Sequence, residues 1–222
     1  NRANAEGVGS AATYPFGRGG FEVSKLEEAT AKRYLPAAEL SKLKSTTASN
    51  PQCEYARKLF LFSYYCYGIS FIDMAMLTTA HIKQMEDGDY IVYKRQKIKR
   101  QKGVKPISIK ITPAIRQLIG SLQAASPTVD DFLLPIVTRS GYTGERLYMH
   151  IRTRYSKYQK YLRLLAEELG IDFHLTSYVS RHTAAMTLQR NNIPREVISQ
   201  MLGHADLETT NIYLDSFDNE VI

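Results

Sequence analysis

Two segments near the carboxyl end decide the fold of this chain: Leu175-Thr-Ser-Tyr-Val-Ser-Arg-His-Thr-Ala-Ala185 and Met201-Leu-Gly-His-Ala-Asp-Leu-Glu-Thr-Thr-Asn-Ile-Tyr213. They place an arginine, a histidine and a tyrosine at fixed separations. Arg181 precedes His204 by 23 positions, and His204 precedes Tyr213 by 9. A guanidinium, an imidazole and a phenol are the groups that an attack on a phosphodiester needs when no metal ion takes part.

The composition narrows the range of partners. The 222 residues carry a net charge of +7, so a polyanionic partner is expected, either nucleic acid or an anionic membrane. No apolar run approaches the ~20 residues that cross a bilayer, and the first residues lack the apolar centre of a signal peptide. The sequence therefore favours nucleic acid over a membrane.

The cysteines and histidines do not form a metal-binding pattern. Cys53 and Cys66 lie 13 positions apart in one apolar stretch, which is typical neither of a disulfide framework nor of a zinc site. We therefore expect no metal and a reducing cytoplasm.

Periodicity predicts a mainly helical protein with a small antiparallel sheet, an α+β fold. Residues 1–20 are rich in glycine and read as a linker. Two β-branched runs at 90–98 and 105–111 flank a basic loop and predict a hairpin. Helices are predicted from about Pro36 and over about 52–67, 71–77, 113–122, 145–169 (closed by Gly170), 177–191, 194–202 and 206–214.

The spacing of Arg181, His204 and Tyr213, with Leu202-Gly203 before the histidine, resembles the catalytic part of the tyrosine recombinases, or phage integrase family. The likeness is greatest to integrases of mobile elements such as conjugative transposons. It implies site-specific DNA recombination and integration through a 3′-phosphotyrosine intermediate, without a cofactor. It also implies a division into the linker and remnant of a core-binding domain (1–20), the catalytic domain (21–217) and a C-terminal tail (218–222).

The resemblance makes Tyr213 the nucleophile, Arg181 the phosphate clamp and His204 a second donor to the phosphate. A free tyrosine has a pKa near ~10, so it attacks readily only beside positive charge or a base. Nine residues along one continuous helix would turn His204 and Tyr213 to opposite faces. We therefore expect His204 in a turn after Gly203, with Tyr213 on the following helix.

The sequence departs from the family pattern at two positions. The family has a histidine three residues before its second arginine, and this position holds Tyr178, which leaves the general base open. The family's first arginine corresponds to Ser70. Our hypothesis is that Arg95 supplies the missing cation, because it would share a strand face with Lys97, the candidate general acid. Asp73 matches an acidic family position and is expected to order the site.

Further basic residues are expected to contact DNA: Lys94, Lys99, Arg100 and Lys102 around the hairpin loop, and Arg152, Arg154 and Lys157 on the long helix. The resemblance implies a homotetramer on two double-stranded DNA sites, with host DNA-bending proteins as further partners. It also implies that the C-terminal tail docks onto a neighbouring protomer.

Two alternatives stay open at the level of sequence. The first is a catalytically inactive DNA-binding relative, which the substitutions Ser70 and Tyr178 suggest. The second is an enzyme like the type IB topoisomerases, which uses the same chemistry to relax supercoils. A covalent adduct on nicked DNA would exclude the inactive relative, and relaxation without paired sites would favour the topoisomerase.

Overall fold

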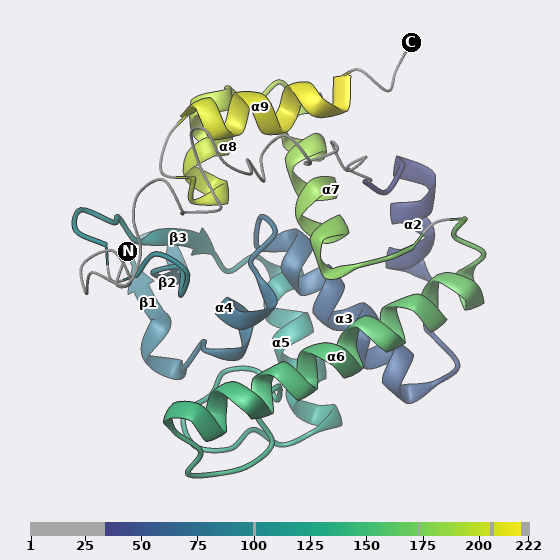
Figure 1. The fold of residues 1–222 in the computed structure, drawn as a ribbon, viewed down its shortest axis with the longest axis vertical. Coiled ribbons are helices and arrows are strands. Elements are labelled where there is room, and N and C mark those ends of the chain that lie inside the picture. The colour runs from purple at the N-terminus through teal and green to yellow at the C-terminus, as the bar shows by residue number, and fades with distance from the viewer. Residues whose placement is uncertain (1–33, 100, 173, 205–206, 219–222) are drawn as a thin grey trace, which may run out of the picture. The chain divides into compact units, whose positions relative to one another are not determined.

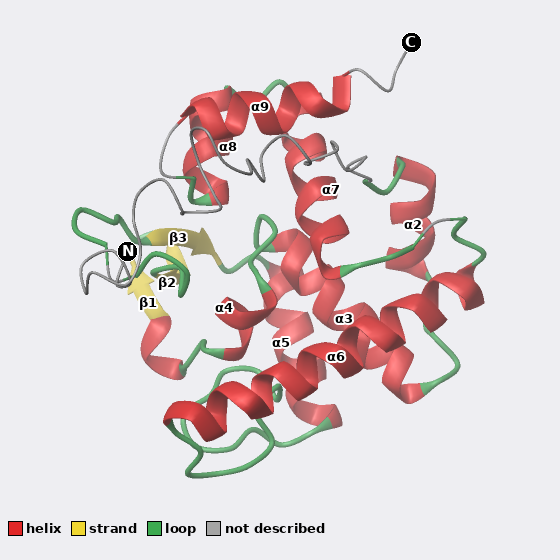
Figure 2. Cartoon of the chain, in the orientation of Figure 1, coloured by secondary structure: helices red, strands yellow, loops and turns green. Residues whose placement is uncertain are grey.

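The computed structural model describes residues 34–99, 101–172, 174–204 and 207–218. The expected linker at 1–20, the expected start of the catalytic domain at residue 21, and the tail from 219 onward lie outside these residues. The described chain is mainly helical with one small sheet, as expected (Figure 2). The helices are α2 (Ala37–Ser45), α3 (Pro51–Tyr65), α4 (Phe71–Ala75), η3 (Thr79–His81), α5 (Pro113–Ala125), α6 (Gly144–Leu169), α7 (Ser177–Arg190), α8 (Arg195–Leu202) and α9 (Leu207–Asp218).

Helix α3 lies at the centre of the core, and α5, α6 and α7 pack against it (Figure 1). Its side chains Leu59, Phe60 and Phe62 are fully buried. Fully burying a large apolar side chain contributes about 1.5–3 kcal/mol, so this one helix supplies a large share of the hydrophobic stabilisation. The dense apolar stretch therefore forms a helix covered on most sides, as its sequence predicts.

The helix ends match their sequence signals. Asn50 caps α3 by accepting from the amides of Gln52 and Cys53 at 2.8 and 3.4 Å. Thr112 caps α5, which begins at Pro113. The backbone of Gly170 adopts a left-handed conformation, with φ of 63°, where α6 ends. Each signal is local in the chain, and the helix bounds were therefore predictable.

The sheet has three antiparallel strands in the order β1 (Ile82–Met85), β2 (Gly88–Tyr93) and β3 (Ile107–Lys110). Ile91 of β2 pairs with Ile109 of β3, and both side chains are buried. Strand β1 was not predicted, because three of its four side chains are exposed and show no alternation. The predicted strand at 90–98 was too long, since β2 ends at Tyr93 and the chain then turns.

The last two helices form a unit with α7. Helix α8 packs against α7, α9 and β3. A second apolar cluster joins them and contains the buried side chains Ala185, Ile198, Leu202 and Leu214. Arg195 at the start of α8 adds an ion pair to Asp215 of α9, with 2.7 Å between Nη1 and Oδ1. The helix that carries Tyr213 is thus packed directly against the one that ends before His204.

Candidate active site

Arg181 joins three segments that are distant in sequence. It lies on α7 and is half-buried. Its Nη1 donates to the Gly68 carbonyl at 3.1 Å, and its Nη2 donates to the Leu202 carbonyl at 2.5 Å. Gly68 has a φ of +73°, and a Cβ there would lie 2.5 Å from Arg181 Cα, so only glycine lets the α3–α4 turn approach α7 this closely.

His204 lies in the turn between α8 and α9, as the spacing predicted. Gly203 closes α8 in the left-handed region, with φ of 63°. The amide of His204 donates to the Ser199 carbonyl at 3.0 Å, which is the long hydrogen bond of a Schellman motif. The His204 Nδ1 lies 2.7 Å from the Thr210 hydroxyl on α9. The imidazole is therefore held between the two helices.

Arg95 reaches the same helix end from the loop that follows β2. Its Nη1 donates to the Gly203 carbonyl at 3.0 Å. A Cβ on Gly203 would overlap the Ile107 side chain and come within 3.0 Å of Arg95 Cδ, so glycine permits this contact as well. Arg181 and Arg95 thus bind successive carbonyls, Leu202 and Gly203, immediately before His204.

The end of α8 therefore concentrates positive charge. Carbonyls in the last turn of a helix lack intrahelical partners, and the negative end of the helix dipole attracts cations there. Two guanidiniums use those carbonyls as anchors, and an imidazole follows at once in the chain. A cluster of this kind suits an anion such as a phosphate, because planar guanidiniums can grip its oxygens.

Asp73 fixes the loop that carries Arg95 and Lys97. This carboxylate is 3% exposed, and its Oδ1 accepts the Gln96 amide at 2.7 Å. Its Oδ2 accepts the Ser70 hydroxyl at 2.6 Å, while that hydroxyl accepts the Asp73 amide at 3.2 Å. Ser70 is therefore the N-cap of α4, and Asp73 ties α4 to the loop after β2.

The predicted strand relation between Arg95 and Lys97 was wrong. Both residues lie beyond β2, in a turn closed by a 3.1 Å hydrogen bond from the Ile98 amide to the Arg95 carbonyl. The capture of the Gln96 amide by Asp73 diverts the chain away from the ladder. Lys97 is exposed, whereas Arg95 is half-buried against α8.

The pKa of the buried Tyr93 phenol depends on the charged residues around it. Burial raises the pKa of this phenol, and the carboxylate of Asp73 raises it further. The guanidiniums of Arg181 and Arg95 oppose that rise. All three charged groups consequently lie close enough to influence one buried ring under the site.

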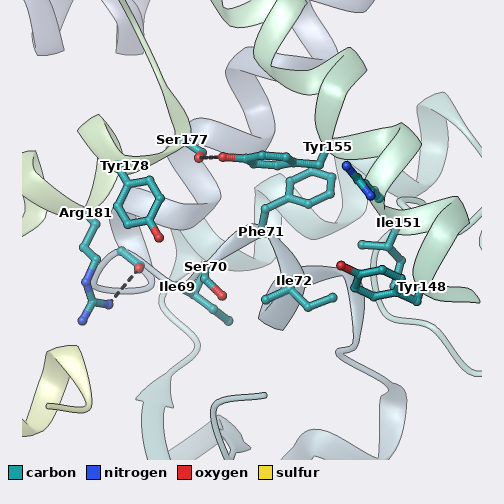
Figure 3. Close-up of a pocket in the computed structure, with 12 residues that line it drawn as sticks. Ile69, Ser70, Phe71, Ile72, Tyr148, Ile151, Tyr155, Ser177, Tyr178 and Arg181 are labelled. Carbon is teal, nitrogen blue, oxygen red and sulfur yellow. Dashed lines mark hydrogen bonds between the residues drawn. The ribbon is translucent and has the colours of Figure 1, made fainter. Parts of the chain in front are cut away.

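Ser70, Tyr178 and Arg181 line a pocket of about 390 Å³ between the α3–α4 turn, α6 and α7 (Figure 3). Tyr178, in the first turn of α7, is 64% exposed, and its ring centroid lies 6.4 Å from that of His182. The structure therefore places both family departures, Ser70 and Tyr178, beside Arg181.

Tyr213 lies within α9, and its side chain is outside the described part of the structure. The neighbouring Leu214 is fully buried between α8 and α7, which sets the position of this helix backbone. The expectation that the tyrosine rides the helix after His204 is therefore confirmed for the backbone alone.

The predicted DNA-contact residues lie in two places. Most are exposed on the loop after β2 or on α6, while Arg100 falls outside the described residues. Arg154 differs, because its guanidinium carbon lies 5.9 Å from the Tyr55 ring centroid and the side chain is half-buried. Burial and the charges of Arg154, Arg139 and Lys157 lower the pKa of His150, which reflects a positive potential along α6. The exposed residues among the predicted contacts are Lys94, Lys99, Lys102, Arg152 and Lys157.

The part of the chain that the structure describes holds neither a metal-ligand cluster nor a membrane-spanning helix. In the described ranges, no three His, Cys, Asp or Glu side chains gather as metal ligands would. In the same ranges, every helix is too short or too polar to cross a membrane.

Sequence reasoning missed three parts of this arrangement. Thr210 is the partner of His204, and the Gln96 amide is the partner of Asp73. Tyr148 lines the pocket from α6. The spacing of an i, i+6 pair such as His204 and Thr210 gives no signal, because a turn intervenes.

The chain belongs to the phage integrase family, whose model matches residues 33–220. Among curated relatives, it is 31% identical to tyrosine recombinase XerC of Rhodospirillum centenum over 114 residues, 51% of this chain and 31% of that protein. It is 43% identical to tyrosine recombinase XerD of Halalkalibacterium halodurans over 54 residues, 24% of this chain and 18% of that protein. The chain therefore spans about a third or less of these relatives.

Solved structures share the fold. The XerA recombinase matches with a TM-score of 0.58 and 21% identity, covering 87% of this chain and 65% of that one. The Tn1549 transposon integrase, solved in complex with transposon right end DNA, matches with a TM-score of 0.59 and 13% identity. That match covers 90% of this chain and 69% of the integrase. The fold predicted from sequence is thereby confirmed.

Proposed function

We propose that this chain performs site-specific recombination of double-stranded DNA by cutting and rejoining strands through a 3′-phosphotyrosine at Tyr213. The observation that carries the proposal is the convergence of Arg181 and Arg95 on the two carbonyls before His204. Membership of the phage integrase family supports the same reaction.

The chemistry follows from charge. A phosphodiester carries one negative charge, and its pentacoordinate transition state carries about two. Cationic donors held at fixed positions therefore bind the transition state more tightly than the ground state. In our proposal Arg181, Arg95 and His204 contact the non-bridging oxygens. Tyr213 attacks the phosphorus while its phenol proton passes to solvent water, and Lys97 protonates the departing 5′-oxygen. The phosphotyrosine ester conserves the energy of the broken bond, so religation needs no cofactor.

Arg95 takes the place of the family's first arginine in this proposal. Ser70, which occupies that position, is engaged with Asp73 and serves as a helix cap. Arg95 instead approaches from the loop after β2 and meets the chain next to His204. Arg95 thus shares a helix end with Arg181, and does not share a strand face with Lys97.

The partners follow from the same proposal. Exposed cations on the loop after β2 and along α6 would lie on the DNA backbone, and each phosphate contact would add about one unit to the salt dependence of binding. We further propose a homotetramer on two DNA sites with DNA-bending host proteins, and a tail from residue 218 that docks onto the next protomer. A bacterial cytoplasmic, nucleoid-associated location is part of this proposal.

A nicked suicide substrate tests the function. The downstream product of cleavage diffuses away from such DNA, so the covalent intermediate accumulates. We expect the wild-type chain to form a protein–DNA adduct that denaturing electrophoresis retains. Tyr213→Phe removes the attacking oxygen and should abolish the adduct, whereas Tyr161→Phe, a matched loss of hydroxyl on α6, should leave it. An adduct that survives in Tyr213→Phe would refute the assignment.

A further inference from the structure

The pocket beside Arg181 has an unusual lining. Tyr148 is 58% exposed and Tyr178 is 64% exposed, and both line this pocket. Among the tyrosines whose side chains the structure describes, these two are the exposed ones. Figure 3 shows them at opposite ends, with Ser70 and Ile72 between them. Exposed aromatic rings gathered at one pocket indicate a binding surface.

The wall between the rings is largely apolar. Ile69, Phe71, Ile72 and Ile151 contribute to the lining. The hydroxyls in it already have partners within the protein: Ser70 bonds Asp73 at 2.6 Å, and Tyr155 lies 3.1 Å from Ser177. The pocket therefore offers mainly apolar contact, which suits a flat ring more than a polar chain.

An arginine side chain lines the pocket at each end of this apolar wall. Arg181 lies at the end of the pocket near Tyr178, as Figure 3 shows, and the exposed Arg152 lines the pocket from α6 together with Tyr148. A guanidinium binds phosphate through two parallel hydrogen bonds. An occupant with an anionic phosphate at one end and a flat aromatic ring at the other is a nucleotide.

We propose that this pocket takes one nucleotide of the DNA strand, unstacked from its neighbours. Its phosphate lies at Arg181, and its base crosses Ser70 and Ile72 to stack on Tyr148, with Arg152 at the base edge. The volume of about 390 Å³ falls in the range of sites for small ligands, about 300–1,000 Å³. This inference rests on the proposed function, because there Arg181 binds the scissile phosphate.

Stacking on a tyrosine tolerates every base, since each base has a π-face. The pocket would therefore hold the nucleotide next to the cut without reading its identity. Stacking in this pocket would keep the end of the cleaved strand in place during strand exchange.

The test compares two single strands of 11 nucleotides. One is thymidine throughout, and the other has the same backbone without bases, so both carry the same charge and respond alike to salt. Binding is followed by fluorescence anisotropy at one ionic strength. We expect the wild-type chain to bind the base-bearing strand about tenfold more tightly, as base stacking predicts. Tyr148→Ala should lose that preference, and Tyr148→Phe should keep it.

Met149→Ala is the matched control, because Met149 is the next residue on α6, is 49% exposed and does not line the pocket. Equal affinity of the wild-type chain for both strands would overturn the proposal, as would a preference that survives in Tyr148→Ala. The adduct assay separates the two claims. An adduct without base-dependent binding refutes the pocket alone, and base-dependent binding without an adduct refutes the chemistry alone.

Discussion

At the scale of single residues, two guanidiniums share one helix end. Arg95 and Arg181 donate to neighbouring carbonyls, at 3.0 and 2.5 Å. Losing one such donor would raise the barrier to cleavage more than it would weaken DNA binding, since the transition state carries the extra charge.

We therefore predict that Arg95→Ala slows adduct formation about 10²–10³-fold, the usual cost of one donor to a developing anion. Lys94→Ala, which removes an exposed neighbouring cation, should change the rate much less. Single-turnover cleavage of the nicked substrate at saturating protein measures both. Wild-type rates in Arg95→Ala would show that this residue only anchors the loop to α8.

At the scale of elements, Asp73 joins α4 to the loop after β2. Its removal leaves the half-buried Ser70 hydroxyl and Gln96 amide without this acceptor, which costs about 1 kcal/mol for each group. We predict that Asp73→Ala lowers hydrogen-exchange protection of the Gln96 amide and slows cleavage. Asp73→Asn keeps an acceptor oxygen, so it should preserve most of that protection. Equal protection in Asp73→Ala and the wild type would contradict this coupling.

The elements also show which features sequence can predict. Caps such as Asn50 and Thr112 and the closing Gly170 are local signals, and the helices they bound were predicted well. The course of the loop at Arg95 was not, because Asp73 directs it from 23 positions away. The short, exposed strand Ile82–Met85 lacks the alternation that identifies strands.

The candidate site also has one part that the sequence predicts and one part that it does not. The turn position of His204 followed from its spacing to Tyr213 and from Gly203. The contact of Arg95 with the Gly203 carbonyl depends on how the sheet packs against α8, which no local pattern encodes.

At the scale of the whole molecule, an ion pair remote from the site supports the core. Arg57 is 8% exposed, binds both Glu54 oxygens at 2.7 Å and donates to the Leu43 carbonyl at 2.8 Å. It thereby joins α3 to α2. Burial alone would raise the pKa of Glu54, but hydrogen bonds from Arg57 and the Ala48 amide, with nearby positive charge, lower it below its ordinary 4.5.

We predict that Arg57→Met destabilises the fold by about 1–3 kcal/mol at neutral pH, because the half-buried Glu54 carboxylate loses two charged hydrogen bonds and keeps only the Ala48 amide and the more distant Lys58, at 3.9 Å. The folded pKa of Glu54 is the lower one, so its contribution is present above pH 4.5 and is lost as the pH falls through that folded value. Urea unfolding from pH 7 to pH 3 should therefore show a difference between variant and wild type that shrinks toward acid. A difference that stays constant with pH would contradict this role.

The central claim is that fixed cations neutralise charge on the phosphate while Tyr213 attacks it. A methylphosphonate at the scissile position replaces one charged oxygen by a methyl group and so removes that need. We predict that Arg181→Ala cleaves the ordinary nicked substrate at least 10²-fold more slowly than the wild type but cleaves the methylphosphonate at close to the wild-type rate. Equal losses of rate on both substrates would show that Arg181 does not neutralise charge on the phosphate.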